Sequence, residues 1–220
     1  MTTFPSLGGT LRPDQVHVWV VPLEDPAKPR RRELAHLAEG ILLASYLALT
    51  PARLEFERGP GGKPRLRGEP LQYNLSHSER FALVAVSAEL PVGVDVQAPH
   101  PATERPWFAR RICSPREYAQ LEREPLGPGS HGPAAGPAGL LRLWTRKEAV
   151  LKARGEGSYV AVNEIDVLDD RVAGGWRCVD LALGADAPGY TGVDAPGYCA
   201  AVALPDRAGT SVCLRRFVWP

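Results

Sequence analysis

The order of predicted elements along this 220-residue chain indicates an α+β fold with two similar lobes. Apolar runs of strand length lie on both sides of a helical stretch at 33–49. Further helical stretches follow between residues 104 and 152, and strand-like runs then continue to the end of the chain. Because the segments before and after residue 101 have comparable element content, the predicted lobes are 1–101 and 102–220.

Composition excludes several classes of protein. With 44% hydrophobic and 23% charged residues, the chain belongs to the soluble globular class. Its 26 Lys and Arg are balanced by 25 Asp and Glu, so no nucleic-acid partner is expected. No apolar run approaches the ~18–20 residues of a membrane helix, and no signal peptide is evident, which predicts a cytoplasmic protein without a membrane partner. The cysteines are spaced too widely for a CxxC site and are predicted to be free thiols: Cys113, Cys178, Cys199 and Cys213.

The first third of the chain predicts a strand at 16–21, the helix at 33–49 and a short strand at 54–57. His17 lies inside the first strand, where a hydrogen-bonded structural histidine is expected. The glycine-rich turn at 59–66 carries Lys63, and its backbone N–H groups favour a close approach to an anion. Taken alone, this segment is better explained as an ordinary surface turn.

Strands are predicted at 81–86 and 92–97. Strand alternation places Asp95 and Gln97 on the same face of the second strand. A buried carboxylate is costly unless it is paired or binds a cation. Asp95 is therefore a candidate metal ligand, although a salt bridge or a turn cap is an equally good explanation.

Two short helices are predicted at 104–111 and 114–121. Ser114 suits the N-cap of the second, Pro115 its first position, and Glu117 the acidic position of a capping box. This arrangement explains Glu117 without any catalytic role. Glycine, proline and alanine then predict a flexible surface insertion at 125–139, and strands are expected at 160–167, 176–183, 198–204 and 211–218.

The helical stretch at 144–152 carries the densest charge pattern. Trp144, Glu148 and Lys152 share one helical face, and Lys147 lies about 100° around the helix from Glu148. One explanation is a solvated helix face, on which the Glu148–Lys152 pair adds only ~0.3–0.5 kcal/mol. A functional explanation requires a second carboxylate, such as Asp95, to share a metal ion.

Four motifs in this order resemble those of the Sfp-like 4'-phosphopantetheinyl transferase superfamily. The resemblance covers about residues 62–157 and rests on Gly62-Lys63-Pro64, Tyr73-Asn74-Leu75-Ser76-His77-Ser78, Gly93-Val94-Asp95-Val96-Gln97 and Trp144-Thr145-Arg146-Lys147-Glu148-Ala149-Val150-Leu151-Lys152. It implies two pseudo-symmetric lobes with coenzyme A in the cleft between them. It also implies transfer of the phosphopantetheine arm to a serine of an apo acyl or peptidyl carrier protein, with release of 3',5'-ADP.

The resemblance also implies roles for individual residues. Asp95 and Glu148 would hold Mg²⁺, with Gln97 as a third ligand, directly or through water. The coenzyme contacts would be Lys63, Ser76 and His77 at the 3'-phosphate and adenylate end, and Lys147 and Lys152 at the pyrophosphate. Lys152 would also stabilise or protonate the leaving group. The proton of the carrier serine could go to Glu148, to Glu117 or to a metal-bound water, and Glu117 is favoured.

Three departures from the family pattern stand out. Gln97 replaces an acid of many members, which predicts weaker Mg²⁺ binding or a better tolerance of Mn²⁺. His36 occupies what is often an arginine for the coenzyme phosphate, for which 30–32 could compensate. The segment 111–115 replaces a more aromatic run, and the basic stretch 105–116 is a candidate carrier-docking patch, although solvated arginines explain it equally well.

Two other functions stay open at this stage. One is a non-catalytic coenzyme A or carrier-protein binding module of the same fold. The other is a Mg²⁺-dependent phosphohydrolase, for which paired acids are too few. Fatty acid, polyketide and nonribosomal peptide carriers all remain candidates, and the length of the chain favours a monomer.

Overall fold

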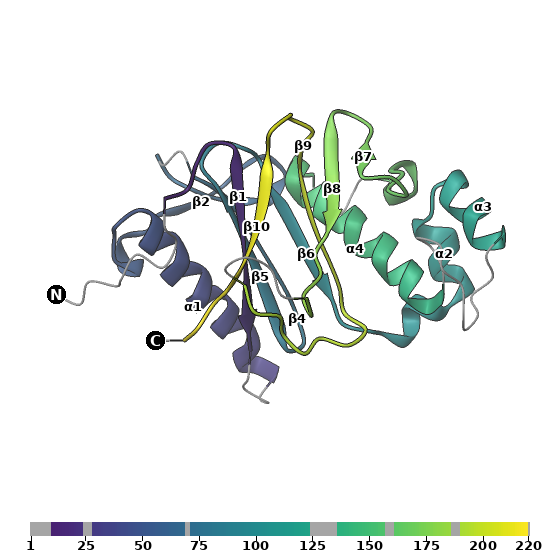
Figure 1. Cartoon of the computed structure of the whole chain (residues 1–220), viewed down its shortest axis with the longest axis horizontal. Coiled ribbons are helices and arrows are strands. Elements are labelled where there is room, and N and C mark those ends of the chain that lie inside the picture. The colour runs from purple at the N-terminus through teal and green to yellow at the C-terminus, as the bar shows by residue number, and fades with distance from the viewer. Residues whose placement is uncertain are drawn as a thin grey trace.

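The computed structural model describes residues 10–23, 28–68, 71–123, 136–156, 161–185 and 190–219. Within them the chain forms two four-stranded sheets, a small hairpin and four α-helices (Figure 1). The mixed α+β class predicted from the sequence is therefore confirmed. In the described part of the chain no helix is long and apolar enough to cross a membrane.

The first sheet has the order β10 (Ser211–Arg216), β1 (Gln15–Pro22), β5 (Phe81–Ser87) and β4 (Gln72–Ser78). The second has the order β6 (Gly93–Gln97), β9 (Cys199–Pro205), β8 (Trp176–Asp180) and β7 (Arg171–Val172). The hairpin pairs β2 (Phe56–Arg58) with β3 (Pro64–Leu66). The helices are α1 (Lys28–Tyr46), α2 (Pro106–Ile112), α3 (Pro115–Arg123) and α4 (Gly136–Arg154).

Three hydrophobic cores hold these layers together. Alternate residues of β1 and β5, such as Val18 and Leu83, join Val94 of β6 in a core shared by both sheets. The intervening residues, such as Val84, pack with α1 on the other face. A third core lies between α4 and the second sheet and includes Ala201. Each fully buried valine or leucine contributes roughly 1.5–3 kcal/mol, so the cores fix both long helices against their sheets.

The two sheets meet where β4 lies beside β6. Alternate polar side chains of β4 accept hydrogen bonds from backbone N–H groups of β6, at 2.8, 3.4 and 3.0 Å, in the pairs Asn74 with Val94, Ser76 with Val96, and Ser78 with Ala98. Side chains here take the place of a backbone ladder. The polar alternation of the Tyr73 to Ser78 motif thus has a structural purpose, since it joins the sheets beside Asp95.

Most predicted elements are confirmed, with several differences. Residues 72–78 form β4 although no element was assigned to them, and the turn at 59–66 includes β3. The strand expected at 160–167 is wrong over the described residues 161–167, which contain only a 3₁₀ turn at Val162–Glu164. Helix α4 starts at residue 136, inside the expected insertion, while 125–135 lies outside the described residues.

The two sheets do not divide the chain at residue 101. Strand β10, near the C-terminus, pairs in parallel with β1, and β6 pairs with β9 in the second sheet. Pseudo-symmetric lobes at 1–101 and 102–220 therefore remain a prediction, while the sheets exchange strands across that boundary. Two smaller predictions are confirmed: all four cysteines are free, and the buried His17 contacts the hydroxyl of Tyr46 through Nδ1 at 2.6 Å.

Candidate active site

Asp95 is the centre of a polar cluster at the junction of the sheets. It is fully buried in β6, and its Oδ1 accepts a hydrogen bond from Ser76 Oγ at 2.7 Å. The same oxygen lies 2.5 Å from Lys152 Nζ, and Oδ2 accepts a hydrogen bond from Gln97 Nε2 at 2.9 Å. The cost of burying this carboxylate is offset by one cation and two hydrogen-bond donors.

Helix α4 supplies the other two charges. Lys152 Nζ also donates to Ser76 Oγ at 3.1 Å and to the carbonyl of Val94 at 3.4 Å. Glu148 lies one helical turn before Lys152. Burial and, secondly, the charge of Asp95 raise the pKa of Glu148, whereas Lys152 lowers it. Two carboxylates and one ammonium group thus share a partly buried site.

Gly93 allows α4 to approach β6 this closely. A Cβ atom at this position would lie 2.1 Å from the carbonyl oxygen of Ala149 and 2.2 Å from the backbone nitrogen of Ala153. These distances are far inside van der Waals contact. The glycine of the Gly93 to Gln97 motif is therefore required for the packing that brings Lys152 to Asp95.

The side chains around Asp95 fit a Mg²⁺ ion that also binds substrate phosphate. Mg²⁺ is commonly held by one or two carboxylates, with water and phosphate oxygens completing its octahedron. Glu148 and Asp95 interact electrostatically and would be the carboxylate pair for such an ion, while the described residues contain no cluster of three His, Cys, Asp or Glu side chains. A cation between them would relieve the repulsion that raises the pKa of Glu148. Gln97 directs its amide N–H to Asp95, and coordination through its oxygen remains a prediction.

Lys147 and Glu117 do not belong to this cluster, which corrects the roles expected for them. Both side chains are fully buried, and Lys147 Nζ lies 2.7 Å from Glu117 Oε2. The ammonium group also donates to the carbonyl oxygens of Val162 and Ile165. Lys147 therefore cannot face a pyrophosphate in this conformation.

Glu117 has no oxygen left for a substrate proton. Its Oε2 accepts from the backbone of Ser114 at 2.7 Å, and its Oε1 accepts from the backbone of Val167 at 2.8 Å. The hydroxyl of Ser114 in turn accepts from the backbone of Glu117 at 3.1 Å, which completes the predicted capping box. The structural explanation of Glu117 is confirmed, and its carboxylate contacts Lys147 and two backbone N–H groups rather than the residues around Asp95.

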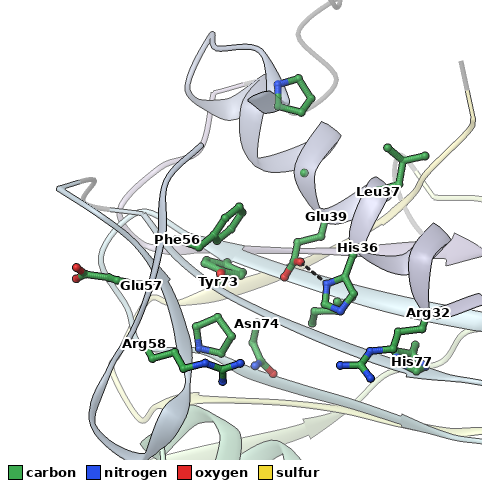
Figure 2. Close-up of a pocket in the computed structure, with 14 residues that line it drawn as sticks. Arg32, His36, Leu37, Glu39, Phe56, Glu57, Arg58, Tyr73, Asn74 and His77 are labelled. Carbon is green, nitrogen blue, oxygen red and sulfur yellow. Dashed lines mark hydrogen bonds and ion pairs between the residues drawn. The ribbon is translucent and has the colours of Figure 1, made fainter. Parts of the chain in front are cut away.

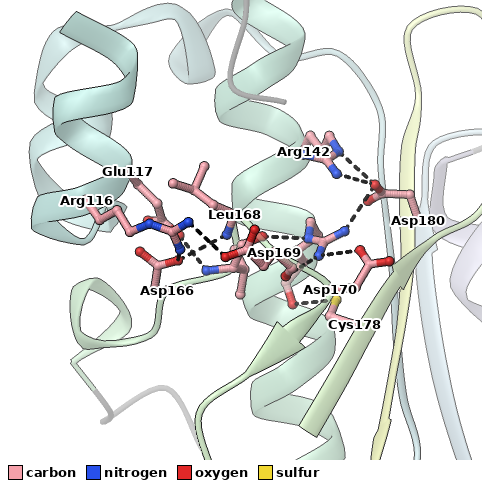
Figure 3. Close-up of polar contacts among 11 residues, drawn as sticks. Arg116, Glu117, Arg142, Asp166, Leu168, Asp169, Asp170, Cys178 and Asp180 are labelled. Atoms are coloured by element: carbon pink, nitrogen blue, oxygen red, sulfur yellow. Dashed lines mark hydrogen bonds and ion pairs between the residues drawn. The ribbon is translucent and has the colours of Figure 1, made fainter. Parts of the chain in front are cut away.

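A wider polar network continues from this pair and holds residues 161–180 against α3 and α4 (Figure 3). The guanidinium of Arg146 is fully buried and lies 3.1 Å from both Asp170 and Asp180. Arg116 pairs with Asp166 and Asp169 at 3.0 and 2.8 Å. The Arg146 and Lys147 part of the α4 motif therefore fixes the helix, and the Glu148 and Lys152 part faces the site.

Lys63 lies in the turn between β2 and β3. Its Nζ donates to the carbonyl of Val92 at 2.7 Å, and burial lowers its pKa to about 8. It lines a cavity of about 350 Å³ together with Arg65 and Arg154. Val92 immediately precedes the motif of Asp95, so Lys63 lies beside the same strand as the central cluster.

A pocket of about 860 Å³ lies between α1, the β2–β3 hairpin and β4 (Figure 2). Figure 2 shows Arg32 and His36 projecting from α1 toward β4, where His77 lies. Burial lowers the pKa of His77, as do the charges of His36, Arg32 and Lys152. Because Lys152 acts on His77, the pocket and the Asp95 cluster are electrostatically connected. Of the lining residues, sequence reasoning missed Glu39, Arg58 and Tyr73, whereas Arg32 belongs to the basic run 30–32 that was expected to compensate for His36.

Tyr73 is the most unusual of these missed residues. Its side chain is 4% exposed, and its hydroxyl has no hydrogen-bond partner among the residues that the structure describes. It lines both the large pocket and the cavity of Lys63. An unpaired buried hydroxyl costs about 1–3 kcal/mol, which a polar ligand group would recover.

The α+β fold therefore places two carboxylates and a lysine beside a pocket that is lined in part by basic side chains. The comparisons give the family. A family model described as the 4'-phosphopantetheinyl transferase superfamily matches residues 91–203. The chain belongs to this superfamily.

Curated relatives agree with this assignment. The chain is 30% identical over 187 residues to the 4'-phosphopantetheinyl transferase HetI of Nostoc sp., covering 72% of this chain and 76% of HetI. It is 35% identical over 152 residues to a putative 4'-phosphopantetheinyl transferase of Synechocystis sp., covering 67% of this chain and 58% of that protein. It is 34% identical over 143 residues to the 4'-phosphopantetheinyl transferase AcpT of Escherichia coli, covering 63% and 65%.

Proposed function

We propose that this protein transfers the 4'-phosphopantetheine arm of coenzyme A to a serine of an apo acyl or peptidyl carrier protein and releases 3',5'-ADP. The observation that carries the proposal is the Asp95–Lys152 pair at 2.5 Å, with Glu148 beside it and the basic pocket adjoining it. Membership of the superfamily supports the same reaction.

The proposed mechanism gives roles to the large pocket, to Ser76, to the two carboxylates and to Lys152. The large pocket binds the nucleotide end of coenzyme A, with His77 at its phosphate, and Ser76 holds Asp95 and Lys152 in place through its hydroxyl. Asp95 and Glu148 would hold Mg²⁺, with Gln97 as an indirect ligand. When bound, Mg²⁺ neutralises charge on the pyrophosphate oxygens.

Transfer breaks one phosphorus–oxygen bond and forms another. The serine oxygen attacks the phosphorus on the pantetheine side, and the bond to the 3',5'-ADP oxygen breaks. Lys152 stabilises the charge on the departing phosphate, a contribution that is worth about 3–4 kcal/mol for a single well-placed donor. Glu148 takes the serine proton, because it is the carboxylate one helical turn from Lys152, the residue at the leaving group.

The carrier would dock on α2. Trp107 is 56% exposed there, and Arg105, Arg110 and Arg111 are exposed around it. The exposed ring stacks edge-on with Phe108, which packs in turn on Trp144 of α4. An apolar anchor surrounded by arginines suits a carrier domain with an acidic surface.

The test is a transfer assay read by intact mass. Purified protein is incubated with coenzyme A, MgCl₂ and an apo acyl carrier protein, and the carrier should gain one phosphopantetheine group. EDTA, Asp95→Asn and Glu148→Gln should each abolish the gain. Glu156→Gln, an exposed change just beyond α4, is the matched control and should retain it.

Other outcomes would point elsewhere. Binding of coenzyme A without transfer to any of several carriers would favour a non-catalytic binding module. Release of phosphopantetheine to water without a carrier would favour a phosphohydrolase.

We further propose a monomeric protein with Mg²⁺ dependence and a measurable tolerance of Mn²⁺, because Gln97 supplies a neutral group where a third acid would select the metal more strongly.

A further inference from the structure

Lys63 differs from the other lysines whose contacts the structure describes. Lys147 and Lys152 each lie within ion-pair distance of a carboxylate, at 2.7 and 2.5 Å, which favours the charged form of both. Lys63 Nζ instead donates to the neutral carbonyl of Val92 at 2.7 Å. Burial lowers the pKa of Lys63 to about 8, so part of the Lys63 population is a neutral amine near neutral pH. The neutral amine is the nucleophilic form of lysine.

The cavity beside this amine is small and positively charged. It has a volume of about 350 Å³ and lies between the β2–β3 hairpin, β4 and the end of α4. Its described lining includes Arg65 and Arg154 beside Lys63, and no Asp or Glu. Arg65 lies 2.6 Å from Glu57, and Arg154 lies 3.7 Å from Glu156, two acids that are not among the lining residues. A cavity at the lower end of the ~300–1,000 Å³ range of ligand pockets has room for a small anion.

Two residues that line the cavity carry buried polar atoms without a hydrogen-bond partner in the described part of the chain. They are Tyr73, through its hydroxyl, and Arg154, through Nε. The Nε–H group can only donate, and the hydroxyl can donate as well. Each buried donor without a partner costs about 1–3 kcal/mol, and an anion with several oxygen atoms would satisfy both. Among small anions, phosphate matches the geometry of a guanidinium group.

We propose that this cavity binds small acyl phosphates and that Lys63 is the residue they modify. Arg154 and Tyr73 hold the phosphate group, and the amine of Lys63 attacks the acyl carbonyl carbon. A nitrogen–carbon bond forms, the carbon–oxygen bond to phosphorus's oxygen breaks, and inorganic phosphate leaves with the electron pair. The surplus proton of the amine passes to solvent, which leaves a neutral amide on Lys63. The step needs neither coenzyme A nor a carrier protein and so goes beyond the proposed function.

The experiment measures acetylation of each lysine by acetyl phosphate. The purified full chain is incubated at pH 7.5 with increasing acetyl phosphate, and peptide mapping by mass spectrometry gives separate rates for Lys28, Lys63, Lys147 and Lys152. We expect Lys63 to react at least about tenfold faster than Lys28, because each pKa unit below the ordinary lysine value gives about tenfold more free amine. The rate at Lys63 should saturate as acetyl phosphate increases, and inorganic phosphate should compete with it.

Three variants make the test specific. Tyr73→Phe removes only the unpaired hydroxyl, so it should raise the half-saturating concentration of acetyl phosphate about fivefold, as for one lost hydrogen bond, without lowering stability. Arg154→Gln should raise that concentration further, because it removes a charge as well. Arg67→Gln removes an exposed arginine that does not line the cavity and should behave as the wild type. Thermal unfolding confirms that each variant is folded.

Several outcomes would overturn the proposal. One is a Lys63 rate that equals that of Lys28, or that increases without saturation. Another is equal labelling by the uncharged donor N-acetylimidazole with no competition from phosphate, which would leave a reactive amine but no phosphate site. Labelling by acetyl-coenzyme A and not by acetyl phosphate would assign the acyl group to a thioester instead. Carrier modification is measured separately, so each of these results leaves the transferase proposal unchanged.

Discussion

Helix α4 makes two lysine–carboxylate pairs, five residues apart, that have opposite surroundings. Lys147 and Glu117 are both 0% exposed, and Glu117 accepts two further backbone hydrogen bonds. Lys152 is 28% exposed beside Asp95, which is 1% exposed. Every charged atom of the Lys147–Glu117 pair is hydrogen-bonded or ion-paired within the protein, whereas the ammonium group of Lys152 remains partly accessible to solvent. Both pairs combine a lysine with a carboxylate, so the completeness of their hydrogen bonding is what distinguishes the pair proposed to perform chemistry.

The largest expected effect follows from breaking the fully buried Lys147–Glu117 pair. Lys147→Met leaves Glu117 charged and buried without its cation, which should lower the free energy of unfolding by about 3–5 kcal/mol. Urea denaturation of the purified variant measures this. Adding Glu117→Gln to the same chain removes the uncompensated charge and should recover part of the loss. A Lys147→Met variant as stable as the wild type would contradict the structural role of the pair.

The partly exposed Lys152–Asp95 pair should respond in the opposite way. Lys152→Ala should reduce kcat for carrier modification by about 10²–10³, which corresponds to ~2.7–4 kcal/mol of transition-state stabilisation. Its free energy of unfolding should change less than that of Lys147→Met, because solvent reaches the vacated position. The measurement is single-turnover carrier modification alongside urea denaturation. An active Lys152→Ala variant would show that the two pairs do not differ in function.

Sequence reasoning succeeded where one element determines the outcome. The alternation of β6 placed Asp95 and Gln97 on one face, and the capping box explained Glu117 from three neighbouring residues. Both conclusions depend only on local geometry.

The burial of Lys147 could not be predicted in the same way. Its position about 100° from Glu148 on the helix was correct, but the segment that covers it, Val162 to Val167, comes from a later part of the chain. The pocket was missed for a related reason. Arg32 and His36 are one turn apart on α1, yet only the packing of α1 on the first sheet brings them to His77. Contacts between distant segments decide which polar groups are enclosed, and no local pattern reports them.

A substitution that shifts α4 relative to β6 should affect the Lys152–Asp95 pair more than a general loss of stability explains. Gly93→Ala places a methyl group within 2.2 Å of backbone atoms of Ala149 and Ala153, so the helix must shift. We expect a loss of about 1–3 kcal/mol of stability, as is typical of overpacking. Transfer activity should fall more than this stability loss explains, because the shift separates Lys152 from Asp95. Ala201→Gly, on β9 in the core below α4, is a control that loosens packing without moving the helix toward Gly93.

The buried His17 tests whether a fully hydrogen-bonded polar network in the core requires a charged group. Its Nδ1 contacts the Tyr46 hydroxyl, which also accepts from Trp19 Nε1 at 2.8 Å, and Arg215 lies 3.3 Å from Nε2. Burial, and then the charge of Arg215, lower the pKa of His17 from 6.5 to about 4. The network is therefore neutral at His17.

Between pH 6.5 and pH 4 the unfolded chain binds a proton that the folded chain does not. The stabilisation is therefore complete above pH 6.5 and is lost as pH falls toward 4. Unfolding in urea should show a loss of about 2 kcal/mol from pH 7 to pH 5 through this one group. His17→Gln should be less stable at pH 7 but should lose this part of the acid dependence, whereas His100→Gln should retain it. An unchanged acid dependence in His17→Gln would mean that the imidazole takes up a proton as readily in the folded protein as in the unfolded chain, so that the buried network does not require a neutral His17.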